Sequence, residues 1–294
     1  MPGAVIRLPP DQLARALDGY RGAAGAKRRQ YALGAVILGF AIAIAGVAGE
    51  VDLPRLFANL HRFPNYLWNL VPALTWTNLW ADLNEWFWDL KGWLKLLVDT
   101  LLIAYLGTLL GFVGAFVLCF SATANLEKRR WLRVASRRFL EFCRTVPEIV
   151  FALLFVVAFG LGPMPGVMAL AIHTMGALGK LFAEVVENID MKPVEGVTST
   201  GAGRLAMLRF AVLPQVMSNF ASYALLRFEI NVRGAAVMGF VGAGGIGVDL
   251  MVAIRKFYYT DVSAILILII VTVMLIDLVT ERVRHALIGM ERRT

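Results

Sequence analysis

Cysteine and histidine are scarce in this sequence. Among its 294 residues there are only two cysteines, Cys119 and Cys143, and three histidines, His61, His173 and His285. The cysteines flank a basic stretch that we expect to be a cytoplasmic loop, so we expect reduced, structural thiols and no disulfide framework. The histidines lie in unrelated places without metal-ligand spacing. The sequence therefore argues against a disulfide-rich domain and against a metal enzyme.

Catalytic motifs are also missing. The sequence has no phosphate-binding P-loop of the Walker type and no convergent set of nucleophile and base. Its apolar runs do not alternate with polar residues as the strands of a membrane barrel do. We therefore expect an all-α protein that is not itself an enzyme, holds no metal or cofactor, and receives any driving energy from elsewhere.

Charge is low and unevenly distributed. Only 17% of the residues are charged and 59% are hydrophobic, giving a mean hydropathy of +0.68, whereas soluble domains hold apolar residues to about 45–50%. The net charge is +8, and the basic residues cluster in short stretches between apolar runs. Such clusters are typical of the positive-inside rule and not of nucleic-acid binding. The sequence predicts an integral membrane protein.

About six apolar runs are expected to cross the membrane as helices, since about 30 Å of hydrocarbon requires roughly 20 residues. They are residues 31–48, 100–126, two runs within 149–179, 211–234 and 262–280. Glycines and prolines at 160–166 divide the third run from the fourth. This hairpin returns the basic carboxyl end to the side of the basic cluster at 27–29, so both termini are expected in the cytoplasm. The carboxyl-terminal basic residues are Arg282, Arg284, Arg292 and Arg293.

The first 97 residues differ from the rest. Run 31–48 resembles a secretory signal, but its apolar core exceeds the about 7–15 residues of such signals, so an anchor helix is favoured. Residues 51–95 hold three prolines and all but one of the tryptophans, which indicates an extracytoplasmic elbow along the bilayer surface. We divide the chain into 1–97 and a transmembrane domain, 98–294. The elbow tryptophans are Trp68, Trp76, Trp80, Trp86, Trp88 and Trp93.

The polar segment 184–214 lies between the fourth and fifth runs. Asp190 is suited to cap a helix, and Gly201 to end it. Residues 203–210 fit a second short helix, and Pro214 fits the first turn of the next membrane helix. We expect a helix–turn–helix that projects into the cytoplasm.

This segment resembles the cytoplasmic coupling loop of ABC importer permeases, whose pattern is Glu-Ala-Ala, three residues, Gly, nine residues, an aliphatic residue, one more, then Leu-Pro. The matching positions are Glu195, Gly196, Gly201, Leu213 and Pro214. The departures are Gly196 and Val197 in place of two alanines and Ala211 in place of isoleucine. The resemblance implies that this loop docks on an ATPase subunit.

A second resemblance, to the phosphonate permeases of the PhnE family, covers most of residues 144–287. It rests on the stretches 143–148, 151–157, 160–163, 172–174, 180–181 and 241–247, together with Glu195-Gly196 and Arg227-Phe228-Glu229. It implies a type I importer subunit with a core like that of methionine permeases and one extra amino-terminal helix, in the bacterial inner membrane. The implied partners are a second copy, two cytoplasmic ATPases that bind ATP and Mg, and a periplasmic or lipid-anchored phosphonate-binding protein.

Alternatives to a phosphonate importer stay open. The same architecture suits import of phosphite or phosphate, because the binding protein does most of the selecting. A secondary transporter would show acidic residues for ion coupling and internal repeats, and a membrane enzyme would need a catalytic or metal site. The sequence shows neither set of features clearly.

Charged residues in membrane helices are candidates for the path of an anion, because an isolated charge in hydrocarbon costs several kcal/mol. Arg227 and Asn231 share one helix face, while Glu229 and Arg233 share another and can neutralise each other. His173 is a candidate donor to the anion or a structural hydrogen-bonding group.

Three further groups are considered, two of them with two interpretations. Arg144 and Glu148 are either a cytoplasmic gate or, as we favour, an intrahelical pair. Asp277 is interfacial, with Arg282 or Arg284 as partner. A glycine cluster serves close helix packing at a periplasmic gate or offers free amides to the anion. Its members are Gly242, Gly244, Gly245 and Gly247.

Overall fold

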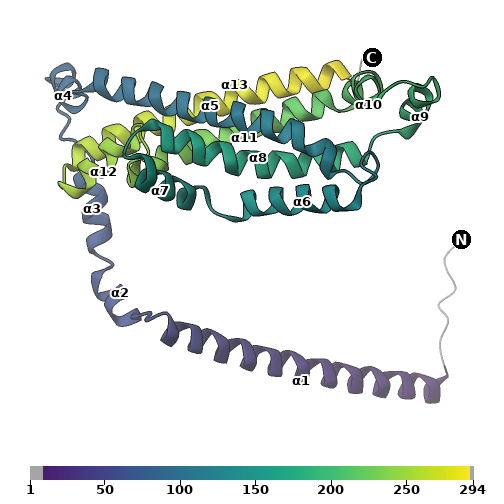
Figure 1. Ribbon diagram of the computed structural model, residues 1–294. Helices are drawn as coiled ribbons and strands as arrows, with labels where there is room; N and C mark the ends of the chain where they lie inside the picture. Colours follow the sequence, from purple (N-terminus) through teal and green to yellow (C-terminus); the bar gives the residue numbers. More distant parts are fainter. Residues whose placement is uncertain (1–8, 292–294) are drawn as a thin grey trace, which may run out of the picture. The chain divides into compact units, whose positions relative to one another are not determined.

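The computed structural model describes residues 9–291. All regular secondary structure in these residues is helical, in α-, 3₁₀- or π-form (Figure 1). The predicted all-α class is confirmed. The chain separates into two compact units, Met1–Tyr66 and Leu67–Thr294. Arg292 and Arg293 of the predicted basic carboxyl end lie outside the described residues.

The first unit contains α1 (Pro10–Ala48), α2 (Leu53–Asn59) and the first half of α3 (Arg62–Leu70). Proline suits the start of α1 because its missing N–H would have no partner there. The carboxyl-terminal part of α1, Lys27–Ala48, is apolar enough to cross a membrane and contains the predicted anchor run. Asp52 caps α2 by accepting a hydrogen bond from the Arg55 amide at 2.9 Å.

The second unit is a helical bundle whose two most closely packed helices are α5 (Leu90–Ala122) and α8 (Pro163–Glu187). Glycines on α5 make this approach possible. A Cβ at Gly107 would lie 2.6 Å from Leu170, and a Cβ at Gly111 would lie 2.6 Å from Thr174. Helix α11 (Leu213–Met238) packs on both of them, α13 (Tyr259–Glu291) packs on α11, and α4 (Leu79–Trp86) and α12 (Gly247–Arg255) lie against α13.

The third predicted run has a different form in the structure. It is α7 (Glu148–Phe159), whose 12 residues reach only about 18 Å. The basic stretch before it, predicted as a loop, is the helix α6 (Arg130–Thr145), and the two helices meet at a bend of 85°. Pro147 at the bend has no N–H to continue α6. The thiols of Cys119 and Cys143 are free, as predicted, and both are buried.

Four described helices are long and apolar enough to span a membrane, and the bent α6–α7 pair is a candidate for a fifth. They are the end of α1, α5, α8 and α13. Helix α11 has 26 residues, enough to cross, but its polar and charged residues lower its hydropathy and it does not count among them. Each of the six predicted runs is therefore helical.

The tryptophans of the predicted elbow divide into exposed and packed side chains. Trp93 is only 3% exposed because α5 begins at Leu90 and carries it into the core, which corrects its assignment to the elbow surface. Trp86 donates its indole N–H to the Thr260 carbonyl and the Ser263 hydroxyl, each at 3.1 Å. Four others are largely exposed: Trp68, Trp76, Trp80 and Trp88.

Candidate functional site

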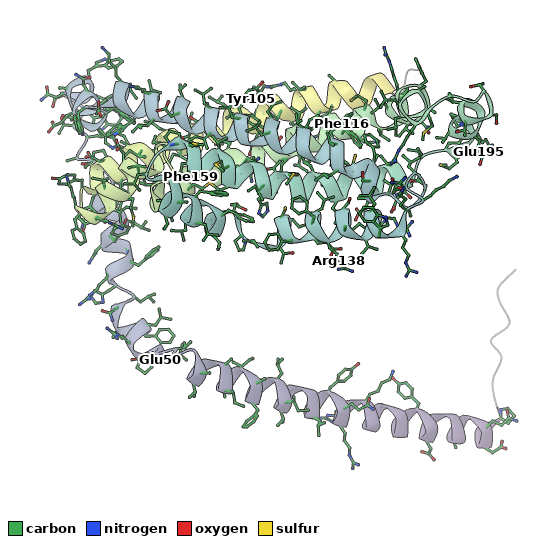
Figure 2. The ribbon with its side chains drawn as sticks, viewed as in Figure 1. Glu50, Tyr105, Phe116, Arg138, Phe159 and Glu195 are labelled. Atoms are coloured by element: carbon green, nitrogen blue, oxygen red, sulfur yellow. The ribbon has the colours of Figure 1, made fainter. Side chains whose placement is uncertain are left out.

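A helical hairpin projects from one end of the second unit, and α4 and α12 lie at the other end (Figure 1). The hairpin consists of α9 (Met191–Ser199), α10 (Arg204–Met207) and the turn between them, and a π-helical turn (Leu208–Val212) leads from it into α11. Figure 2 shows Glu195 at this end, far from Phe159. We call this segment, residues 190–207, the α9–α10 hairpin.

The base of the α9–α10 hairpin is fastened to α11. The Asp190 carboxylate caps α9 by accepting from the Lys192 amide at 3.0 Å. The Gln215 side chain accepts from the Asp190 amide at 3.0 Å and donates to the Asp190 carbonyl at 3.2 Å. Pro214 lies in the first turn of α11, where it was predicted. These bonds join α9 to α11 across 25 residues of sequence.

The turn of the hairpin depends on Gly201. Its φ is +78°, a conformation that glycine adopts without strain. A Cβ at Gly196, Gly201 or Gly203 would meet nothing within 4 Å, so no other part of the protein covers this turn. Leu205 is 85% exposed beside it. The predicted helix–turn–helix is confirmed, and its tip is an open surface with both charged and apolar side chains.

Glu127, after α5, is linked to the same hairpin. Its carboxylate lies 2.9 Å from the Arg204 guanidinium and accepts from the Arg129 amide at 2.9 Å. The Arg129 N–H and the positive charge of Arg204 hold the pKa of the Glu127 carboxyl below its usual value. The hairpin is thus held on one side by α11 and on the other by the segment between α5 and α6.

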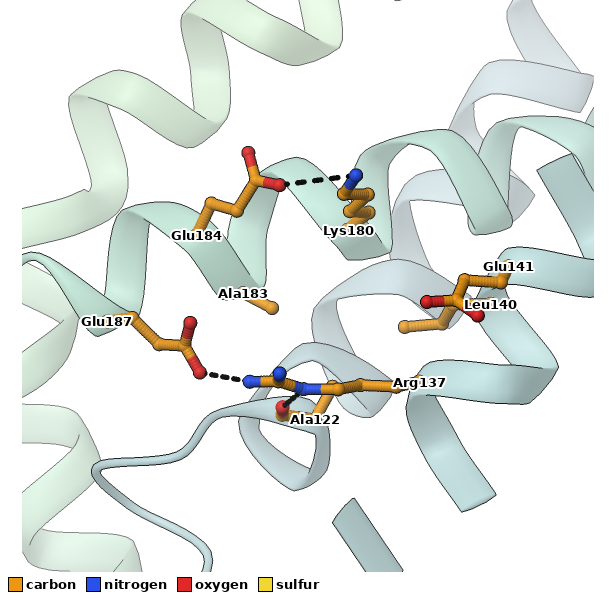
Figure 3. Close-up of a pocket in the computed structure, with 8 residues that line it drawn as sticks. All are labelled: Ala122, Arg137, Leu140, Glu141, Lys180, Ala183, Glu184 and Glu187. Atoms are coloured by element: carbon orange, nitrogen blue, oxygen red, sulfur yellow. Dashed lines mark hydrogen bonds and ion pairs between the residues drawn. The ribbon is translucent and has the colours of Figure 1, made fainter. Parts of the chain in front are cut away.

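Behind the hairpin, a cavity of about 140 Å³ lies where α5, α6 and α8 meet (Figure 3). Arg137 donates to the Ala122 carbonyl at 2.7 Å and forms an ion pair with Glu187. Lys180 and Glu184 pair at 3.5 Å on the same face of α8. These contacts join the ends of three helices. Sequence analysis missed Arg137, whose only visible sign was its place in a basic cluster.

A polar network lies inside the bundle where α5, α8 and α11 cross. The Asn231 amide donates to the hydroxyls of Thr108 and Thr174, each at 2.8 Å. Arg227 donates through Nε to the Thr174 hydroxyl at 3.4 Å. Arg227 and Asn231 do share one face, as predicted, but Asn231 is only 1% exposed. The two threonines escaped sequence analysis because single threonines in apolar runs carry no pattern.

Glu148 and His173 form a second contact close to this network. His173 Nδ1 lies 3.3 Å from the Glu148 carboxylate and 3.1 Å from the Val146 carbonyl. The favoured intrahelical pair of Arg144 and Glu148 is wrong, because the bend at Pro147 puts the two residues on different helices. Glu148 instead begins α7 and faces α8.

The other charged residues of α11 pair with α13. Arg233 lies 3.5 Å from Asp277, and the Thr280 hydroxyl donates to the Glu229 carboxylate. The expected neutralisation of Glu229 by Arg233 is therefore wrong, and so is the expected pairing of Asp277 with the arginines of its own helix. Glu229 is 7% exposed and Arg233 is exposed.

The loop from Gly242 to Gly247 joins a 3₁₀ turn (Gly239–Val241) to α12. We call it the glycine loop. The Gly242 carbonyl accepts from the Gly162 amide at 3.0 Å, and the Ile246 amide donates to the Thr100 hydroxyl at 2.9 Å. A Cβ at Gly245 would lie 2.6 Å from that hydroxyl. Close packing, the first interpretation, accounts for these contacts, and the Ile246 amide is not free for an anion.

One charged cluster in the bundle comes from α7, α8 and α11. Arg227, His173 and Glu148 interact electrostatically with one another. Within residues 9–291 no group of three or more His, Cys, Asp or Glu side chains is arranged to hold a metal. The arrangement suits contact with a small anion and offers no evident nucleophile.

Comparison with known proteins gives a consistent result. The family described as "Binding-protein-dependent transport system inner membrane component" matches residues 107–288, more than half of the chain. The phosphite transport system permease protein PtxC of Stutzerimonas stutzeri is 42% identical over 64% of this chain and 68% of its own length. An Escherichia coli protein described as a cryptic phosphonate transport system permease, PhnE2, is 54% identical over 40% of this chain and 96% of its own.

Among solved structures, the MetNI methionine ABC transporter in an inward-facing conformation has a similar fold. The TM-score is 0.57 at 18% identity, over 66% of this chain and 95% of that one. The identity is low, so the likeness concerns the fold alone. It agrees with the predicted permease core.

Proposed function

We propose that this chain, which belongs to the binding-protein-dependent transport system inner membrane component family, carries phosphonate across the bacterial cytoplasmic membrane as the permease subunit of an ATP-driven importer. The observation that carries the proposal is the α9–α10 hairpin, an uncovered surface at one end of the bundle that is fastened to the charged helix α11. Such a surface suits a partner that pushes on it.

The partners follow from the family. A second copy completes the membrane part, two cytoplasmic ATPases bind ATP and Mg and dock on the hairpins, and a periplasmic or lipid-anchored binding protein delivers the anion. The permease itself catalyses no reaction. We place the hairpins at the cytoplasmic face and, from the positive-inside rule, both termini on the same side. Glu195 is exposed on α9, where it is available to an ATPase.

Transport proceeds by alternating access. ATP closes the ATPases, and their motion reaches α11 through the bonds between Asp190 and Gln215. Helix α11 carries Arg227, Asn231 and Arg233, which together with His173 and Arg144 are our candidates for contact with the anion. Movement of α11 past α8 exposes them first to the periplasm and, after hydrolysis, to the cytoplasm.

The glycine loop lies at the opposite end of the bundle from the hairpin, and we assign it to the periplasmic gate. Its contacts with the segment before α8 and with α5 join three parts of the bundle at one point. A gate built by close backbone packing opens only when these segments separate together.

Phosphonate is the proposed cargo, and phosphite and phosphate are the alternatives. One relative is named for phosphite and another for phosphonate. The three anions share a tetrahedral phosphorus centre with oxygens that arginine binds through paired hydrogen bonds. The permease alone therefore discriminates weakly among them.

The test is uptake into proteoliposomes that contain this chain, its ATPase and its binding protein. Methylphosphonate, phosphite and phosphate are compared in wild type and in Gly201→Asp, which forces an L-residue into a φ of +78°. Gly203→Ala is the matched control, because Gly203 has φ −68° and equal open space. We expect ATP-dependent uptake that Gly201→Asp abolishes and Gly203→Ala preserves. Uptake that needs no ATP would favour a secondary transporter.

A further inference from the structure

Glu148 lies where a transported anion would be expected. It lines a cavity of about 390 Å³ between α7 and α11, together with Arg233 and Gly234. Its side chain is 33% exposed. Gly234 faces this carboxylate, and a Cβ there would lie 3.4 Å from it, at ordinary contact distance.

The guanidinium of the nearby Arg227 lacks part of its hydrogen bonding. Arg227 makes one hydrogen bond among the described residues, through Nε to Thr174, and its two terminal nitrogens have no hydrogen-bond or ion-pair partner there. A guanidinium offers those two nitrogens as a fork that fits a carboxylate or a phosphorus oxyanion. An arginine at membrane depth with an open fork is costly unless an anion compensates it.

Thr174 fixes the direction of that fork. It is fully buried, packs against Gly111, and receives hydrogen bonds from both Asn231 and Arg227. Because its neighbour His173 faces Glu148, the same turn of α8 presents a ring nitrogen to Glu148 and holds Arg227 within electrostatic range of it. The geometry thus places one carboxylate opposite an imidazole and a guanidinium.

We propose that Glu148 is a resident counter-anion whose place beside His173 and Arg227 is taken by the cargo during transport. This inference rests on the proposed function. Without cargo, Glu148 offsets the positive charge and keeps stray anions from binding. When cargo arrives, its oxygens take the Arg227 fork and Glu148 moves into the adjoining cavity. The carboxylate then competes the cargo off again, which gives the weak affinity that release requires.

The position of Glu148 at the amino end of α7 suits both states. A carboxylate in the first turn of a 12-residue helix is stabilised by the exposed amides and the helix dipole wherever its side chain points. The bend at Pro147 provides this helix end in the middle of the bundle.

The test is equilibrium binding of radiolabelled methylphosphonate to the intact permease–ATPase complex in nanodiscs, without binding protein. Glu148→Gln is nearly isosteric and removes the charge, so we expect the Kd to fall at least about fivefold. Arg227→Gln is expected to lose binding. Glu141→Gln removes a carboxylate that pairs with Arg138 within α6, away from Glu148 and Arg227, and is expected to leave the Kd unchanged.

Glu148→Asp keeps the charge but shortens the side chain, and we expect a Kd between those of wild type and Glu148→Gln. The Kd of Glu148→Asp provides the test of the inference if Glu148→Gln assembles poorly. Equal or weaker binding by Glu148→Gln, or by Glu148→Asp in that case, overturns the inference. Wild-type uptake reports separately on the proposed function, because the comparison of variants concerns binding alone.

Discussion

The α9–α10 hairpin and the glycine loop both turn on glycines with positive φ, but their surroundings are opposite. Around Gly201 a Cβ would meet nothing within 4 Å, whereas at Gly245 it would meet Thr100 at 2.6 Å. One glycine shapes a surface that another protein can cover. The other lets two segments of the same chain touch. Identical backbone requirements thus serve an external contact at one end of the bundle and an internal one at the other.

The largest mutational effect is expected at Gly247, at the end of the glycine loop. A Cβ there would overlap the Ala236 carbonyl oxygen, a backbone atom that cannot move aside. We expect Gly247→Ala to destabilise the protein by about 3 kcal/mol, because overpacking against backbone has no cheap relief. Thermal unfolding in detergent measures it, with Gly203→Ala as control. A Tm equal to that of wild type would show that the glycine loop is not closely packed.

A smaller loss is expected for Thr100→Val. Its hydroxyl accepts from the buried Ile246 amide and donates to the Leu96 carbonyl at 2.8 Å. Valine keeps the shape but leaves the amide unpaired, at a cost of about 1–3 kcal/mol. Thr198→Val, whose hydroxyl bonds only to its own helix, is the control and is expected to cost less than about 0.5 kcal/mol. Equal effects in the two variants would contradict the role of Thr100.

Gly196→Ala tests an uncovered glycine of the α9–α10 hairpin and is expected to raise its stability. Gly196 is helical and uncovered, so alanine fits without contact. We expect the α9–α10 hairpin to gain about 0.5–1 kcal/mol, because alanine loses less backbone freedom in a helix. Slower amide hydrogen exchange in residues 191–199, with uptake retained, is the expected readout. Faster exchange would indicate that α9 is not a regular helix in solution.

The smallest effect concerns pH. The pKa of Glu127 is lowered in the folded protein. Its contribution to stability is therefore fully present at pH values above its ordinary pKa of about 4.3, and it is lost as the pH falls through the lowered pKa of the folded state. The Tm difference between wild type and Glu127→Gln should be equal at pH 7.5 and 5.5. It should shrink only below about pH 4. A difference already lost at pH 5.5 would contradict the ion pair with Arg204.

Local chemistry made the α9–α10 hairpin predictable. Asp190, Gly201 and Pro214 each take the conformation that their residue type favours, so their roles could be predicted without knowing which residues pack against them. Helix α6 was missed because its arginines indicated a loop. Its buried residues Ser136 and Cys143 are spaced as on one helix face, but this pattern gains meaning only from the packing against α8.

Long-range pairs were beyond sequence analysis. Asn231 and Thr108 are 123 residues apart, and their contact depends on where three helices cross. Arg233 was given the wrong partner for a similar reason, since a neighbour four residues away was visible and Asp277 on another helix was not. Helix periodicity identifies which residues share a face, but not what lies opposite that face.

The glycine stripe on α5 has a mechanical consequence. With Leu170 and Thr174 seated at Gly107 and Gly111, sliding of α5 along α8 would drive side chains into backbone. We therefore expect α5 and α8 to move together as one rigid unit. In the proposed mechanism, α11 is therefore expected to rotate against this pair about Asn231, which is hydrogen-bonded to both helices. A charged group further along α11 would then move more than Asn231 does.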